Sequence, residues 1–162
     1  MQTMPNNRRD RDPAGRPKNA RPRDALGRPL ARGAVNEMPE EAPAQTPEEA
    51  LARGIEHFNA GRYFQAHEAW EEGWHPAPER ERDFWQGITQ VAVGLVHRGR
   101  GNAHGATTLL RRGGRRLQSY GDTHMGVPVG ALSRFAFETA DRIERNGVDA
   151  PIEVPTIARA DA

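Results

Sequence analysis

The chain has 162 residues and a formal net charge of +1 at pH 7, which fits one ordinary domain and excludes a polyelectrolyte. It contains no Cys, which excludes disulfides and thiolate metal sites and leads us to expect a protein of the reducing cytoplasm. No apolar run approaches the roughly 18 residues of a membrane helix. The N-terminus also lacks the apolar segment of a signal peptide, so we expect no membrane association.

Residues 1–45 differ in composition from the rest of the chain. They are rich in Arg, Pro, Asp and Gly and show no apolar periodicity. Such a segment buries too little apolar surface to offset its conformational entropy, so we predict a disordered Arg/Pro-rich tail and linker. The arginines could contact nucleic acid, but Asp10, Asp12 and Asp24 dilute their charge.

Two helices joined by a tight turn are predicted next. Thr46, Pro47 and Glu49 have the pattern of an N-cap, a first helical residue and a capping box. An apolar stripe at helical spacing follows, made by Leu51, Ile55 and Phe58. Gly61 ends this helix, and a second helix covers about 62–74 before two prolines stop it.

Three more helices complete the predicted bundle, over about 78–98, 102–120 and 128–146. The first of them is apolar on most sides, which indicates a central helix and makes a homodimer conceivable. We therefore predict an all-α fold, a compact bundle of about five helices over residues 46–150. Residues 151–162 are predicted to form an extended C-terminal tail.

The segment YFQAHEAWEEGWHP, residues 63–76, places polar residues on an aromatic helix face. At about 100° per residue, His67 and Glu71 fall within the arc that also holds Trp70 and Trp74, and Glu68 falls at its edge. A buried carboxylate must be paired, protonated or open to water. His67 is one turn from Glu71 and could be its partner.

A polar stripe also runs along the central helix. If its residues Gln90 and His97 face the second helix, a polar cleft results. The binding candidates are then His67, Glu68, Glu71, Trp74, Gln90 and His97. This cleft would take a small molecule or, through His67, Glu71 and His97, a divalent metal ion. The alternative is a purely structural or oligomeric domain, in which His67 and Glu71 form an internal pair that fixes helix register.

A second alternative is a module that binds nucleic acid or an acidic partner. The fourth predicted helix carries a basic patch of Arg111, Arg112, Arg115 and Arg116. With the Arg-rich tail, this patch could contact phosphates without sequence specificity. A solvated or acid-paired helix face is the competing interpretation.

The spacing of these residues resembles the bacterial and archaeal DUF309 family, a domain of unknown function. The resemblance covers about residues 47–120. It rests on Phe58, Asn59, Gly61, Phe64, His67, Glu68, Glu71, Trp74, Gly87, Gln90, His97, Gly101, Asn102 and Gly105. It implies a small all-α bundle and no particular activity, cofactor or substrate. Trp70 departs from the family pattern, which more often has a smaller aliphatic residue there.

Overall fold

The computed structural model describes residues 23–24, 27–31 and 41–160. The chain divides into two units, Met1–Glu41 and Ala42–Ala162. Most of the predicted disordered tail, 1–45, lies outside the described residues. The part of the first unit that is described forms a short turn, in which Arg28 N donates to Asp24 Oδ1 at 2.9 Å.

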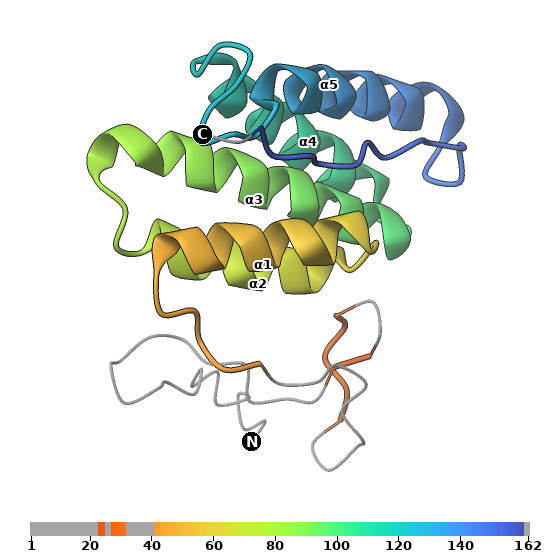
Figure 1. The fold of residues 1–162 in the computed structure, drawn as a ribbon. Coiled ribbons are helices and arrows are strands. Elements are labelled where there is room, and N and C mark those ends of the chain that lie inside the picture. The colour runs from red at the N-terminus through yellow and green to blue at the C-terminus, as the bar shows by residue number, and fades with distance from the viewer. Residues whose placement is uncertain (1–22, 25–26, 32–40, 161–162) are drawn as a thin grey trace, which may run out of the picture. The chain divides into compact units, whose positions relative to one another are not determined.

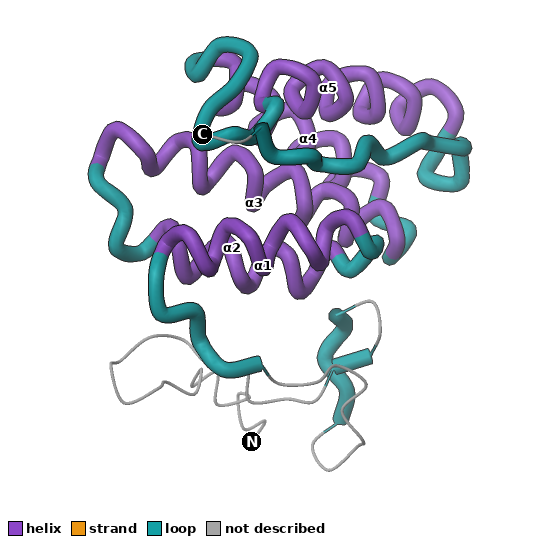
Figure 2. The backbone as a smooth tube through the Cα atoms, viewed as in Figure 1, coloured by secondary structure: helices purple, strands orange, loops and turns teal. Residues whose placement is uncertain are grey.

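The second unit is a bundle of five helices, as predicted. They are α1 (Pro47–Asn59), α2 (Tyr63–Trp74), α3 (Glu79–Gly99), α4 (Ala103–Gln118) and α5 (Val129–Asn146). The described residues include no β-strand, so the all-α fold class is confirmed (Figure 2). None of these helices is long and apolar enough to cross a bilayer.

The first helix begins where the capping pattern predicts. Thr46 Oγ1 accepts from Glu49 N at 3.1 Å, while Glu49 Oε2 accepts from Gln45 N at 2.8 Å. The first bond satisfies a backbone donor that the helix leaves unpaired, and the second ties the residue before the cap to the first turn. At the other end Gly61 has φ +78, a left-handed conformation that lets α2 start two residues later.

The helices pack in chain order, α1 on α2, α2 on α3, α3 on α4 and α4 on α5. Figure 1 shows α3 in the middle, between the α1–α2 pair and the α4–α5 pair. The core contains Trp70 and Trp85, both almost fully buried. Each indole ring lies against a glycine of a neighbouring helix. A Cβ on Gly54 would lie 2.1 Å from Trp70 Nε1, and one on Gly73 would lie 2.4 Å from Trp85 Cζ3.

The residues after α5 run across the bundle without helix or strand (Figure 1). The segment is nevertheless packed, because Ile157 is only 3% exposed and belongs to the hydrophobic core. Ile152 and Val154 are partly buried against the same core. Residues 150–160 therefore lie against the helices.

Candidate functional site

Helix α2 turns one side toward its neighbours and another side outward. Trp70 lies against α1, where its indole Nε1 donates to Leu51 O at 3.3 Å. Gly73 lies against Trp85 of α3. Glu71 is two residues from Gly73, about 200° around the helix, so Glu71 faces away from α3. The two aromatic contacts thus orient α2 and place Glu71 on its outer side.

On this outer side His67 and Glu71 form the predicted pair. His67 Nδ1 lies 2.7 Å from Phe64 O, and its Nε2 lies 3.5 Å from Glu71 Oε1. The imidazole is 16% exposed, whereas the carboxylate of Glu71 is 44% exposed. The Phe64 ring also packs on the imidazole in an edge-to-face arrangement, with centroids 4.8 Å apart. The pair is therefore closed by protein at His67 and open to solvent at Glu71.

The contacts of His67 favour a proton on both of its ring nitrogens. The carbonyl of Phe64 can only accept, so Nδ1 must donate to it. In a neutral ring the lone pair would then sit on Nε2 and face the carboxylate of Glu71. Two acceptors would oppose each other, whereas an imidazolium satisfies both contacts. The structure thus favours a charged pair, His67⁺ and Glu71⁻.

The pKa values of both groups shift in the direction that this pairing demands. Burial alone would lower the pKa of His67, but the hydrogen bond and charge of Glu71, the Phe64 carbonyl and the charge of Glu68 raise it. Burial alone would likewise raise the pKa of Glu71, but the hydrogen bond and charge of His67, helped by His75, lower it. Each group therefore holds the other in its charged form.

Two further predicted residues lie on the same helix. Glu68 is half-buried, and its charge contributes to the raised pKa of His67. Trp74 is partly buried against the core, and its ring stacks on that of His75 with centroids 5.8 Å apart. Trp74 follows Glu71 by three residues, so the two side chains are neighbours on the helix surface.

The other two predicted cleft residues, Gln90 and His97, do not join this group. Gln90 Oε1 accepts from Arg116 Nε of α4 at 3.2 Å. His97 Nδ1 lies 3.0 Å from Asn102 Nδ2, at the turn that leads into α4. The polar stripe of α3 thus binds α4 instead of facing α2, and the predicted cleft between α2 and α3 is wrong. Helical spacing alone could not decide this, because α3 has a neighbour on each side.

His97 has a structural position at the corner between α3 and α4. Asn102 caps α4, since its Oδ1 accepts from Gly105 N at 3.0 Å, and its Nδ2 donates to His97 Nδ1. Burial, together with the charge of Arg100, lowers the pKa of His97. Three residues of the family motif are accounted for by this corner: His97, Asn102 and Gly105.

The predicted metal ligands are not brought together. Within the described residues, no group of three or more His, Cys, Asp or Glu side chains could hold a metal ion. His67 and Glu71 are neighbours, but His97 belongs to the corner of α3 and α4. The set of His67, Glu71 and His97 therefore does not form a metal centre in this structure.

The four arginines of α4 do not form one free basic patch. Arg111 Nη2 binds Asp141 Oδ1 of α5 at 3.0 Å and also contacts Glu144. Arg116 pairs with Asp83 of α3, in addition to its bond with Gln90. Arg112 and Arg115 are exposed. The helix thus uses two of its arginines to hold the helices on either side of it.

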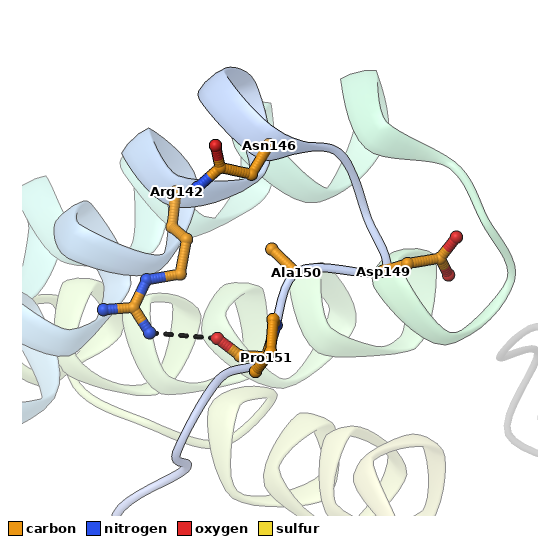
Figure 3. A pocket seen from close by; sticks show the side chains of 5 residues that line it. All are labelled: Arg142, Asn146, Asp149, Ala150 and Pro151. Atoms are coloured by element: carbon orange, nitrogen blue, oxygen red, sulfur yellow. Dashed lines mark hydrogen bonds between the residues drawn. The ribbon is translucent and has the colours of Figure 1, made fainter.

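Two hollows of the bundle surface lie near the end of α5. One open hollow of about 520 Å³ is lined by Arg142, Asn146, Asp149, Ala150 and Pro151 (Figure 3). A second borders it and is lined by Glu138, Asp141, Arg142, Arg145 and Asn146. Neither contains a residue of the predicted site. The His67–Glu71 pair is accordingly not part of either hollow.

Two polar arrangements were missed at the sequence level. Asn59, a motif residue with no predicted role, binds the backbone of Ile157 through both atoms of its amide. His124 Nε2 lies 2.5 Å from Glu81 Oε2, beside the ring of Tyr120. The first had a signal, since Asn59 is part of the motif. The second had none, because Glu81 and His124 are far apart in the chain.

These features define an all-α domain with a charged histidine–glutamate pair on its second helix. The family model called "domain of unknown function (DUF309)" matches residues 51–109, which confirms the resemblance over this part of the chain. The uncharacterized protein YpuF of Bacillus subtilis (strain 168) is 42% identical over 64 residues, 38% of this chain. The match spans 37% of that protein's length. No solved structure gives a significant match.

Proposed function

We propose that the bundle is a binding domain and that the outer face of α2 binds a small organic cation. The observation that carries the proposal is the His67–Glu71 pair. Its imidazole is fixed by the carbonyl of Phe64, and its carboxylate is 44% exposed. An ionised carboxylate that is held in place and open to solvent is a ready acceptor for an ammonium or guanidinium group.

The aromatic residue beside Glu71 supports the same class of ligand. Trp74 lies one turn further along α2 and is partly exposed. A cation near the carboxylate could rest on the indole face, where the ring quadrupole attracts it. Because His67 already neutralises part of the charge of Glu71, we expect modest affinity for a simple ammonium ion.

The state of His67 argues against general-base catalysis by this pair. A general base needs a free lone pair near neutral pH. Both ring nitrogens of His67 are engaged as donors while the pair is intact, and its pKa is raised. The geometry is therefore better suited to holding a ligand than to removing a proton from one.

The test is a titration of the full-length protein with a matched set of probes. These are n-butylammonium, arginine, n-butanol and butyrate, with thermal unfolding as the readout. We expect saturable stabilisation by the two cations and none by the neutral or anionic probe. Glu71→Gln should abolish this stabilisation. Glu56→Gln, an exposed position on α1, is the control that should retain it.

Three results would each refute the proposal. They are equal cation effects in wild type and Glu71→Gln, no cation effect at all, or an effect that butanol reproduces. A parallel titration with Zn²⁺ or Mn²⁺ alone examines the metal alternative. Stabilisation by the metal and by neither organic cation, lost in Glu71→Gln, would reassign the pair to a metal ion.

A further inference from the structure

The C-terminal segment, residues 150–160, contacts the bundle as a bound peptide would. Its partners come from three helices and from the turn before α5. They are Asn59 of α1, Arg98 of α3, Arg142 of α5 and the Met125–Gly126 turn. These partners and the core side chains beneath the segment are called the strap groove here.

Asn59 is the centre of the strap groove. Its Oδ1 accepts from Ile157 N at 2.7 Å, and its Nδ2 donates to Ile157 O at 2.9 Å. One amide side chain thus satisfies both backbone groups of an extended residue, as a neighbouring β-strand would do. The Ile157 side chain is 97% removed from solvent, being 3% exposed. Backbone capture beside a side-chain pocket is the usual way in which proteins bind extended peptides.

The rest of the segment is held in the same manner, by side chains that bind its backbone. Arg98 Nη2 donates to Ala150 O at 2.9 Å. Arg142 Nη1 donates to Pro151 O, also at 2.9 Å (Figure 3). The described residues of this segment make two backbone–backbone bonds, Ala150 N to Gly147 O at 3.2 Å in the turn after α5 and Ala160 N to Gly126 O at 2.9 Å. The segment is therefore held mainly by side chains of the bundle and not by pairing with a strand or by extending a helix.

A turn with unusual backbone angles receives the end of the segment. Met125 and Gly126 have φ of 49 and 74, the pattern of a type I′ turn, which Met adopts rarely. Their consecutive carbonyl groups both accept from the segment. Met125 O accepts from Arg159 Nη2 at 3.1 Å, and Gly126 O accepts from Ala160 N. Arg159 also pairs with Glu48 at the start of α1, which fastens the end of the segment.

We propose that the strap groove is an interaction surface for the C-terminal segment of a second copy of this chain. The strap groove binds backbone groups and apolar side chains of the segment. The same segment of another copy can therefore make every contact that the chain's own segment makes. The connection from α5 is short, and Gly147 within it has φ +87. Exchange of a terminal element through such a hinge is a low-cost route to a dimer.

Two complementary variants of the full chain test the exchange. Ile157→Asp makes the segment a poor occupant and leaves the groove intact. Asn59→Ala weakens the groove and leaves the segment intact. We expect light scattering to show a heterodimer when the two variants are mixed, joined by the intact segment of one and the intact groove of the other. Neither variant alone should dimerise in this way.

A labelled peptide of residues 148–160 measures the same surface without a second folded chain. We expect saturable binding to Ile157→Asp and at least 10-fold weaker binding to wild type. The tethered segment of the wild type competes at a millimolar effective concentration. Binding should also weaken at least 10-fold in the Asn59→Ala, Ile157→Asp double variant.

The controls separate a failed proposal from a failed fold. Helix content by far-ultraviolet circular dichroism must be unchanged in each variant. If Ile157→Asp loses its helices, Arg159→Ala replaces it, because that change removes the contacts of Arg159 with Met125 and Glu48 and leaves the buried Ile157 in place. Folded variants that neither form a mixed dimer nor bind the peptide overturn the proposal. Peptide binding without a mixed dimer rules out the second copy as the occupant.

Discussion

At the scale of single residues, a hydrogen bond to the backbone sets the orientation and the charge of the His67 ring. Its Nδ1 is committed to Phe64 O at 2.7 Å, so its Nε2 is directed at Glu71. The charge of the pair then follows from donor and acceptor counting rather than from the sequence pattern alone. The same argument gives the pair a characteristic dependence on pH.

We predict that the His67–Glu71 pair stabilises the domain most in a window of mildly acidic pH. The raised pKa of His67 stabilises the fold fully below its ordinary value of 6.5, and this contribution is lost as pH rises through the folded pKa. The lowered pKa of Glu71 stabilises the fold above its ordinary value of 4.5, and this is lost as pH falls through the folded pKa. The stabilising contributions of His67 and Glu71 are therefore both present between the two ordinary pKa values, 4.5 and 6.5.

Glu71→Gln should therefore cost most at about pH 5–6, in the window set by those two ordinary pKa values, and less at pH 9. The cost should be only about 0.5–1 kcal/mol, because solvent screens a carboxylate that is 44% exposed. Urea unfolding of both proteins across this pH range measures the difference, with Glu56→Gln as the control. A difference that does not vary with pH would mean that the pair is not ionised as described.

The residues of the site divide into those that spacing could predict and those it could not. His67 and Glu71 are four residues apart on one helix, so their contact follows from helix geometry. Gln90 and His97 also share a face, but a helical wheel gives directions only relative to its own helix. Whether that face meets α2 or α4 depends on tertiary packing. The motif marked Asn59 as a residue of interest, but its partner Ile157 could not be predicted, since the two residues are 98 positions apart.

At the scale of elements, helix bounds were predictable because capping and stop signals are local. Thr46, Gly61 and Gly147 lie where the structure starts or ends its helices. The glycines inside helices were less predictable. Gly113 and Gly114 lower the helix propensity of α4 by about 1 kcal/mol each, yet α4 is helical through both. The reason lies in what each glycine faces.

Gly113 and Gly114 should respond differently to the same substitution. A Cβ on Gly113 would lie 2.7 Å from Gly87 O and 3.0 Å from Val91 N, both backbone atoms of α3. A Cβ on Gly114 would lie 3.0 Å from the ring of Phe137, a half-buried side chain that can shift. We predict that Gly113→Ala destabilises by about 2–3 kcal/mol and that Gly114→Ala stays within about 1 kcal/mol of wild type.

Urea unfolding at neutral pH measures both variants of α4. If Gly113→Ala were as stable as wild type, the close approach of α3 and α4 at this point would be incorrect. Because α3 lies between the other helices, the loss at Gly113 should lower the stability of the whole bundle in one transition. Two separate transitions would show instead that α1–α2 and α4–α5 unfold independently.

At the scale of the whole molecule, charge is divided unevenly between the two parts of the chain. Residues 1–45 contain nine basic and six acidic residues, a net charge of +3, which leaves −2 for residues 46–162 of a chain whose total is +1. In the bundle, Arg111 and Arg116 of α4 are paired with acidic residues of neighbouring helices. The excess positive charge of the chain therefore lies before α1 rather than in the bundle.

We predict that any binding of oligonucleotides by this protein requires residues 1–41 and that the bundle folds without them. A chain of residues 42–162 should keep its helix content and its urea midpoint, because the hydrophobic core lies within these residues. Binding of a labelled single strand, measured by fluorescence anisotropy at 20 and 200 mM NaCl, should be weak and salt-dependent in the full chain and absent in the shortened one. Replacing the exposed Arg112 and Arg115 by Ala in the full chain is the matched control and should change little. Loss of binding in that control, with residues 1–41 present, would instead assign the contact to α4.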